Sequence, residues 1–77
     1  MTEQEQVKEQ LQEQLEKVKQ RLQILDMIEE KLFQMKELAQ RVIDEDLTDV
    51  EIQEINHEVK NLGEQVKLLD REATQFS

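Results

Sequence analysis

The sequence predicts an all-α protein, an antiparallel two-helix hairpin or coiled coil that assembles into a helical bundle. Apolar residues recur every three or four positions along two long stretches, which is the spacing of one helical face. The 77 residues include no Pro and one Gly, and a short acidic segment separates the two stretches. We therefore expect helices over about residues 3–45 and 49–75, with residues 1–77 forming a single hairpin unit.

The first helix is expected to begin at a capping box made by Thr2 and Glu5. Its apolar spacing slips near residues 22–28, where the stripe broadens to include Ile24, Met27 and Phe33. A broad apolar stripe suits packing against more than one neighbouring helix. The stripe consists of Val7, Leu11, Leu15, Val18, Leu22, Leu25, Ile28, Leu32, Met35, Ala39 and Val42.

The acidic segment VIDEDLTDVEIQ, residues 42–53, is dense enough in carboxylates to suggest a calcium loop. A calcium loop starting at Asp44 needs Gly at its sixth position and Glu at its twelfth, and this chain has Asp and Ile there. Thr48 and Glu51 instead form a second capping box. The segment is therefore interpreted as a turn with a capped helix after it.

Two alternatives remain open at this turn. The carboxylates of residues 44–46 oppose the dipole of the first helix, so one continuous rod competes with the hairpin. The hairpin is favoured because it buries the apolar face of the second helix. No Lys or Arg lies between Arg41 and Lys60, so the tip of the hairpin is either a solvated acidic end or a docking site for a basic partner.

The second helix has the more regular coiled-coil pattern, with apolar residues at strict steps of three and four. Gly63 follows one of them, and it either permits a close helix approach or is incidental, at a cost of about 1 kcal/mol relative to Ala. The apolar positions are Ile52, Ile55, Val59, Leu62, Val66, Leu69, Ala73 and Phe76.

A hairpin of two helices with such unequal lengths leaves the first ~20 residues without an internal partner. Burying each exposed aliphatic side chain contributes about 1.5–3 kcal/mol. We therefore expect these residues to bind a helix, either of the same chain in a homo-oligomer (a dimer or higher) or of another protein. The expected interface is Val7, Leu11, Leu15, Val18, Leu22, Leu25 and Ile28.

The formal net charge of −9 disfavours nucleic acid and anionic membranes as partners, because both repel an acidic surface. The first ten residues lack the basic start and apolar core of a secretory signal, so we expect a cytoplasmic protein. The chain has no Cys, and its single histidine, His57, is expected at an exposed position. We expect no enzymatic activity, no cofactor and no metal site.

Three short motifs occur in order in the second half of the chain. Residues 32–39 read LFQMKELA, residues 55–62 read INHEVKNL and residues 74–77 read TQFS. They resemble the flagellin patterns L-x-x-[VM]-[RK]-E-L-A, I-x-x-E-I-x-x-L and T-x-F-N, within residues 28–77. The resemblance implies the helical hairpin of the filament-forming inner region of flagellin, and export through a flagellar-type apparatus. The acidic loop departs from the family, which prefers Asn, Ser and Thr there.

Two functions follow as hypotheses. The first is a structural protein, flagellin-like in its hairpin, that self-associates or packs with partner helices. The second is an acidic adaptor or chaperone, such as a flagellar export chaperone, that covers an amphipathic helix of a client. The groove of the adaptor would comprise Ile24, Leu25, Met27, Ile28 and Phe33.

Overall fold

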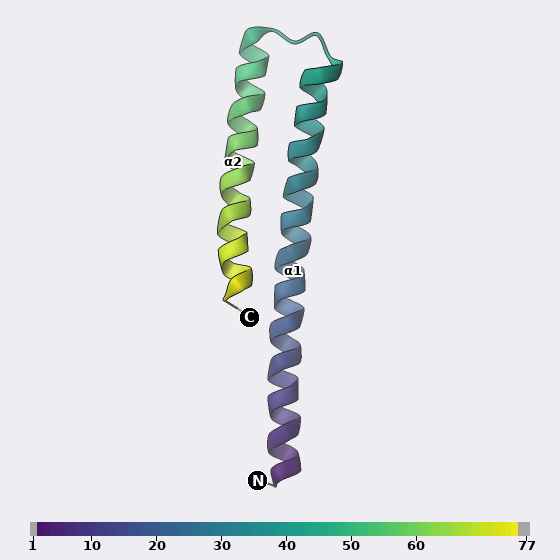
Figure 1. Cartoon of the computed structure of the whole chain (residues 1–77), viewed down its shortest axis with the longest axis vertical. Helices are drawn as coiled ribbons and strands as arrows, with labels where there is room; N and C mark the ends of the chain where they lie inside the picture. The colour runs from purple at the N-terminus through teal and green to yellow at the C-terminus, as the bar shows by residue number, and fades with distance from the viewer. Residues whose placement is uncertain (1, 76–77) are drawn as a thin grey trace.

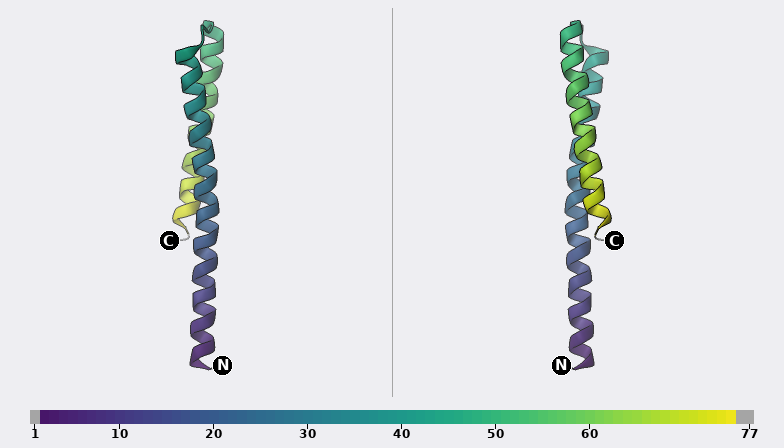
Figure 2. Two further views of the ribbon diagram at one scale, coloured as in Figure 1. Left: turned by 90° about the vertical axis from the view of Figure 1, so that its right-hand side faces the viewer. Right: turned by 90° about the vertical axis from the view of Figure 1, so that its left-hand side faces the viewer.

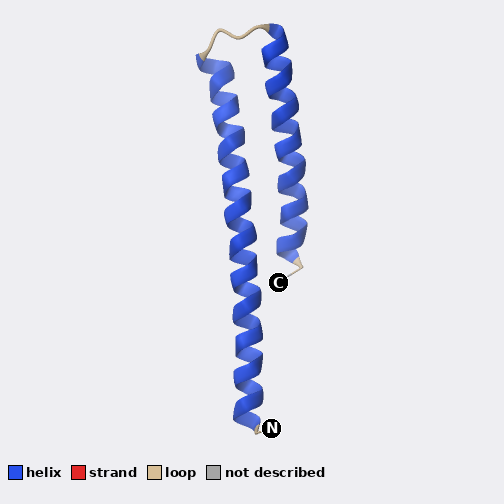
Figure 3. Cartoon of the chain, turned by 180° about the vertical axis from the view of Figure 1, so that it is seen from behind, coloured by secondary structure: helices blue, strands red, loops and turns tan. Residues whose placement is uncertain are grey.

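Two α-helices lie side by side in the computed structural model of the chain (Figure 1). The structure describes residues 2–75, so the expected apolar position Phe76 lies outside the described part. Helix α1 runs over Glu3–Asp44 (42 residues) and helix α2 over Asp49–Thr74 (26 residues). Seen from the front and from behind, α2 folds back along the second half of α1, and only a short loop joins them (Figures 1 and 3). The all-α antiparallel hairpin is therefore confirmed, and the continuous rod is excluded.

Local sequence signals explain where both helices begin. Thr2 and Thr48 have extended backbone conformations, and each side chain accepts a hydrogen bond from the backbone N–H three residues later. The bonds to Thr2 Oγ1 from Glu5 and to Thr48 Oγ1 from Glu51 are both 3.2 Å long. Glu51 Oε1 also accepts from the backbone N–H of Thr48 at 3.3 Å. The capping box predicted at Thr48 and Glu51 is therefore present, and it fixes the start of α2 directly after the turn.

Two carboxylates at the end of α1, those of Asp44 and Glu45, each gain a partner from the preceding helical turn. Gln40 Nε2 donates to Asp44 Oδ2 at 3.0 Å, and Arg41 Nε donates to Glu45 Oε2 at 3.2 Å. The backbone N–H of Glu45 also donates to the carbonyl of Arg41 at 2.9 Å, and Glu45 itself has an extended backbone. These local contacts offset the unfavourable position of the acidic residues at a helix C-terminus. The chain can leave the helix there without a glycine.

The contact between the helices is a narrow apolar seam. Buried residues within residues 2–75 occur only on α2, at Ile55, Leu62 and Ala73, which are 5%, 8% and 4% exposed. The residues of α1 that face them are half-buried at most, because one neighbouring helix covers only part of a helix surface. We call the α1 side of this contact the inner seam: Ile24, Ile28, Lys31, Met35, Leu38 and Val42.

The described chain forms a single layer of two helices. Its extents are 68 × 18 × 11 Å, and the shortest of them is about the diameter of one helix with its side chains. When the molecule is turned by 90°, one helix largely overlies the other (Figure 2). No described segment of this chain therefore covers either broad face of the hairpin.

Gly63 lies in α2 opposite Met35 of the inner seam. A Cβ added to Gly63 would lie 3.7 Å from Met35 Cε, which is an ordinary van der Waals contact. Close helix approach therefore does not require the glycine.

Gly63→Ala should raise the free energy of unfolding by about 0.5–1 kcal/mol, because Ala loses less conformational entropy in a helix. Thermal unfolding at one fixed protein concentration measures this gain, and a lower melting temperature would show that the helices need the glycine.

Candidate interaction surface

Helix α1 carries a second apolar face besides the inner seam. Three positions of the inner seam, 24, 31 and 38, are each followed directly by an apolar residue. These apolar residues are Leu25, Leu32 and Ala39. Since one residue turns a helix by about 100°, the second row points well away from α2. We call this row the outer stripe: Val7, Leu11, Leu15, Val18, Leu22, Leu25, Leu32, Ala39 and Ile43.

The outer stripe is exposed along the whole of α1. Leu25 is 42% exposed, and Ile43, next to the turn, is 76% exposed. Leu15, in the half of α1 that extends beyond α2, is 67% exposed. Glu29 and Lys36 interrupt the row, which otherwise stays aliphatic from Val7 to Ile43. A row of exposed aliphatic residues over so many helical turns is typical of a helix that packs against a further helix.

The first part of α1, beyond the end of α2, has apolar residues on the outer stripe alone. Continuing the inner seam backwards by seven and fourteen residues from Ile24 and Ile28 leads to polar side chains. A helix that prolonged the path of α2 would therefore meet a polar surface there. The polar residues at these four positions are Gln10, Gln14, Lys17 and Arg21.

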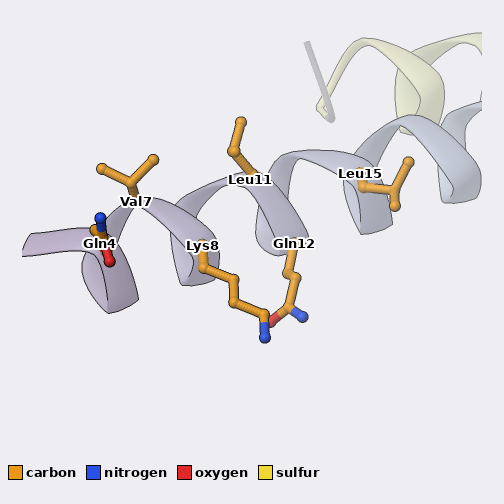
Figure 4. A pocket seen from close by; sticks show the side chains of 6 residues that line it. All are labelled: Gln4, Val7, Lys8, Leu11, Gln12 and Leu15. Carbon is orange, nitrogen blue, oxygen red and sulfur yellow. The ribbon is translucent and has the colours of Figure 1, made fainter.

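The apolar side chains at the start of α1 face solvent and are not covered by another described segment. Figure 4 shows Val7 and Leu11 projecting together from one side of the helix, while the longer side chains of Lys8 and Gln12 extend along another. A shallow hollow lies between these apolar and polar side chains, and all the residues that line it belong to α1. It is a helix surface available for packing and has no walls that would enclose a small molecule. The lining residues are Gln4, Val7, Lys8, Leu11, Gln12 and Leu15.

The structure divides the interface residues expected from the sequence between two faces. Val7, Leu11, Leu15, Val18, Leu22 and Leu25 all lie exposed on the outer stripe. Ile28 is half-buried in the inner seam, as are Met35 and Val42 of the apolar stripe predicted for the first helix. The predicted single stripe is therefore two rows, each facing a different direction.

The groove expected for an adaptor is not one surface. Ile24 and Ile28 are half-buried against α2, whereas Leu25, Met27 and Phe33 are exposed. Phe33 lies six positions after Met27, which places the two side chains on different sides of α1. An amphipathic helix cannot contact all five residues at once, so an adaptor site would have to use the outer stripe.

The polar side chains within residues 2–75 do not form a metal site. His57 is exposed on α2, and among residues 2–75 no group of three or more His, Cys, Asp or Glu side chains is arranged to hold a metal ion. No helix within the described residues is both long and apolar enough to cross a membrane. Comparison of the chain with protein-family models, curated proteins and solved structures found no significant match. The outer stripe is therefore the feature on which a function can be argued.

Proposed function

We propose that the protein is a non-enzymatic structural or interaction protein, a coiled-coil hairpin that self-associates or packs with a partner helix through the outer stripe. One observation carries this proposal: α1 already has a partner on its inner seam and still exposes a second row of aliphatic residues along its length. Proteins that remain monomeric rarely expose continuous apolar patches of this kind.

The energetics of the long helix support the same conclusion. An isolated helix of about 12–15 residues is only marginally stable in water, and most helix stability in proteins comes from packing. The part of α1 beyond α2 lacks such packing against residues 2–75, although it is apolar at Val7, Leu11 and Leu15. Each of these side chains contributes about 1.5–3 kcal/mol when it is buried. Association would therefore stabilise the helix and bury the stripe at the same time.

Sedimentation of the wild-type chain tests the proposal. At micromolar concentration we expect a defined oligomer with high helicity, and its melting temperature should rise with protein concentration because association stabilises the folded state. A stable, fully helical monomer of 9.2 kDa that gains no partner in solution would contradict self-association.

The net charge of −9 supports a second candidate, an acidic adaptor or chaperone that binds a basic amphipathic helix of a client. The motifs of residues 32–39 and 55–62 that resemble flagellin are compatible with both candidate functions. In each candidate function a further helix packs beside the hairpin. The two candidates differ in the behaviour of the chain alone. An adaptor should remain monomeric, with a poorly ordered start of α1, and gain helicity when the client helix is added. A self-associating chain should reach full helicity without any client.

A further inference from the structure

We propose that the outer stripe is covered by a second copy of this chain, whose α1 lies antiparallel to the first α1 along its full length. The inference rests on the proposed function and specifies the partner, the direction and the register of the contact. Three observations lead to it: the charges that border the stripe, the charged residues within it, and the position of α2.

The charges bordering the outer stripe are mixed, although the chain as a whole is strongly acidic. On a helix wheel only three of the 19 acidic residues lie within or beside the stripe, together with four of the ten basic ones. A strongly basic client would meet four cations and only three carboxylates on this face. A partner with the same mixture of charges fits better, and a second copy has it. The residues are Glu5, Asp26 and Glu29, and Lys8, Lys19, Arg21 and Lys36.

The charged residues within the row determine the direction of the contact. Lys8, Glu29 and Lys36 occupy core positions of the heptad pattern that the outer stripe follows. In a parallel, in-register pair each of them would face its own equivalent, so like charges would meet in three core layers. In an antiparallel pair each faces a different residue, and these repulsive layers disappear.

Full overlap of the two α1 helices then gives a favourable register. The centre of Glu3–Asp44 lies between Gln23 and Ile24, and a two-fold axis there keeps core positions opposite core positions. The two layers beside the axis become entirely apolar, the next layer on each side pairs Val18 with Glu29 of the second copy, and an oppositely charged pair flanks the core on each side of the axis. Leu15 faces Leu32 of the second copy, Leu22 faces Leu25 of the second copy, and Lys19 faces Asp26 of the second copy.

The position of α2 leaves room for this arrangement. Because α2 packs on the inner seam, about 100° round α1 from the outer stripe, it does not block the approach of a second α1. Each α2 also covers only the second half of its own α1 (Figure 1). In an antiparallel dimer the two α2 helices therefore lie at opposite ends, and the two α1 helices form the centre.

Disulfide mapping tests the inference. Because the sequence contains no Cys, only the introduced cysteines can form a cross-link. Leu15→Cys and Leu32→Cys are made as separate full-length variants, one of them with a tag that changes its size, and are mixed, refolded together and oxidised. We expect a cross-linked heterodimer from the mixture and no cross-link from either variant alone. In the proposed register, equivalent cysteines lie about 25 Å apart along the helix, far beyond the reach of a disulfide. A mixture of Leu15→Cys and Leu22→Cys is the matched control and should not cross-link.

The outcomes separate this inference from the proposed function. Cross-linking of Leu15→Cys with itself would show a parallel pair and would overturn the inference, while self-association through the outer stripe would stand. An oligomer in which the Leu15 and Leu32 variants fail to cross-link would also overturn the register. A wild-type chain that remains monomeric in sedimentation would overturn both self-association and the inference.

Discussion

Replacing Val18, Leu22 and Leu25 together by Asp is expected to reduce the assembly to a monomer of 9.2 kDa. The three side chains are 53%, 56% and 42% exposed, and all lie on the outer stripe, so the substitutions remove little of the inner seam. In the assembly they would place three uncompensated carboxylates in each half of an apolar interface, at a cost of several kcal/mol. Sedimentation measures the loss of mass. Circular dichroism should show a partial loss of helix from the start of α1, with α2 retained.

A matched control places the same three charges elsewhere on α1. Gln6, Gln23 and Met27 are all exposed and lie outside both the outer stripe and the inner seam. The triple variant Gln6→Asp, Gln23→Asp and Met27→Asp should keep the mass of the wild-type oligomer. If the stripe variant keeps that mass too, the outer stripe is not the interface. If both variants dissociate, net charge is the cause and not the position of the substitutions.

Ile55→Ala is expected to open the hairpin. Ile55 is 5% exposed and is one of the few residues of α2 that are buried against α1. Large-to-small changes at such positions cost about 2–5 kcal/mol, and a core of this size rarely supplies more than about 3–5 kcal/mol. The substitution should therefore remove most of the stability of the contact, with α2 losing helicity well before α1 on heating.

The measurement needs a constant protein concentration, because the stability of an associating chain depends on it. Leu68→Ala is the matched control, since Leu68 is an aliphatic residue of the same helix and is 58% exposed. It should change the free energy of unfolding by no more than about 0.5 kcal/mol. Equal losses at Ile55 and Leu68 would show that α2 is not held by the seam described above.

The helices and their starts could be predicted because their signals are local. Thr2 and Thr48 cap helices through bonds that reach only three residues along the chain. The long apolar periods before and after the turn predict helices whatever the helices later contact. The expected ends, near residues 45 and 75, differ by one residue from Asp44 and Thr74.

The division of α1 into two apolar faces could not be predicted in the same way. The inner seam follows steps of three and four from Ile24 to Val42, but Lys31 occupies one of its positions and interrupts the apolar row. A neighbouring row through Leu25 and Leu32 has apolar residues at the same heights along the helix. Sequence spacing alone does not decide which row meets α2, because that depends on how two whole helices pack.

The acidic turn has a consequence for the size of the assembly. In the proposed dimer the two turns would stand at opposite ends of a strut whose length is close to the 68 Å of a single chain. Each end carries the carboxylates of residues 44–51, and no Lys or Arg lies between Arg41 and Lys60. Two struts meeting tip to tip would repel each other at short range, within a Debye length of about 8 Å at physiological salt. The like-charged ends would therefore oppose end-to-end growth and favour a particle of finite length.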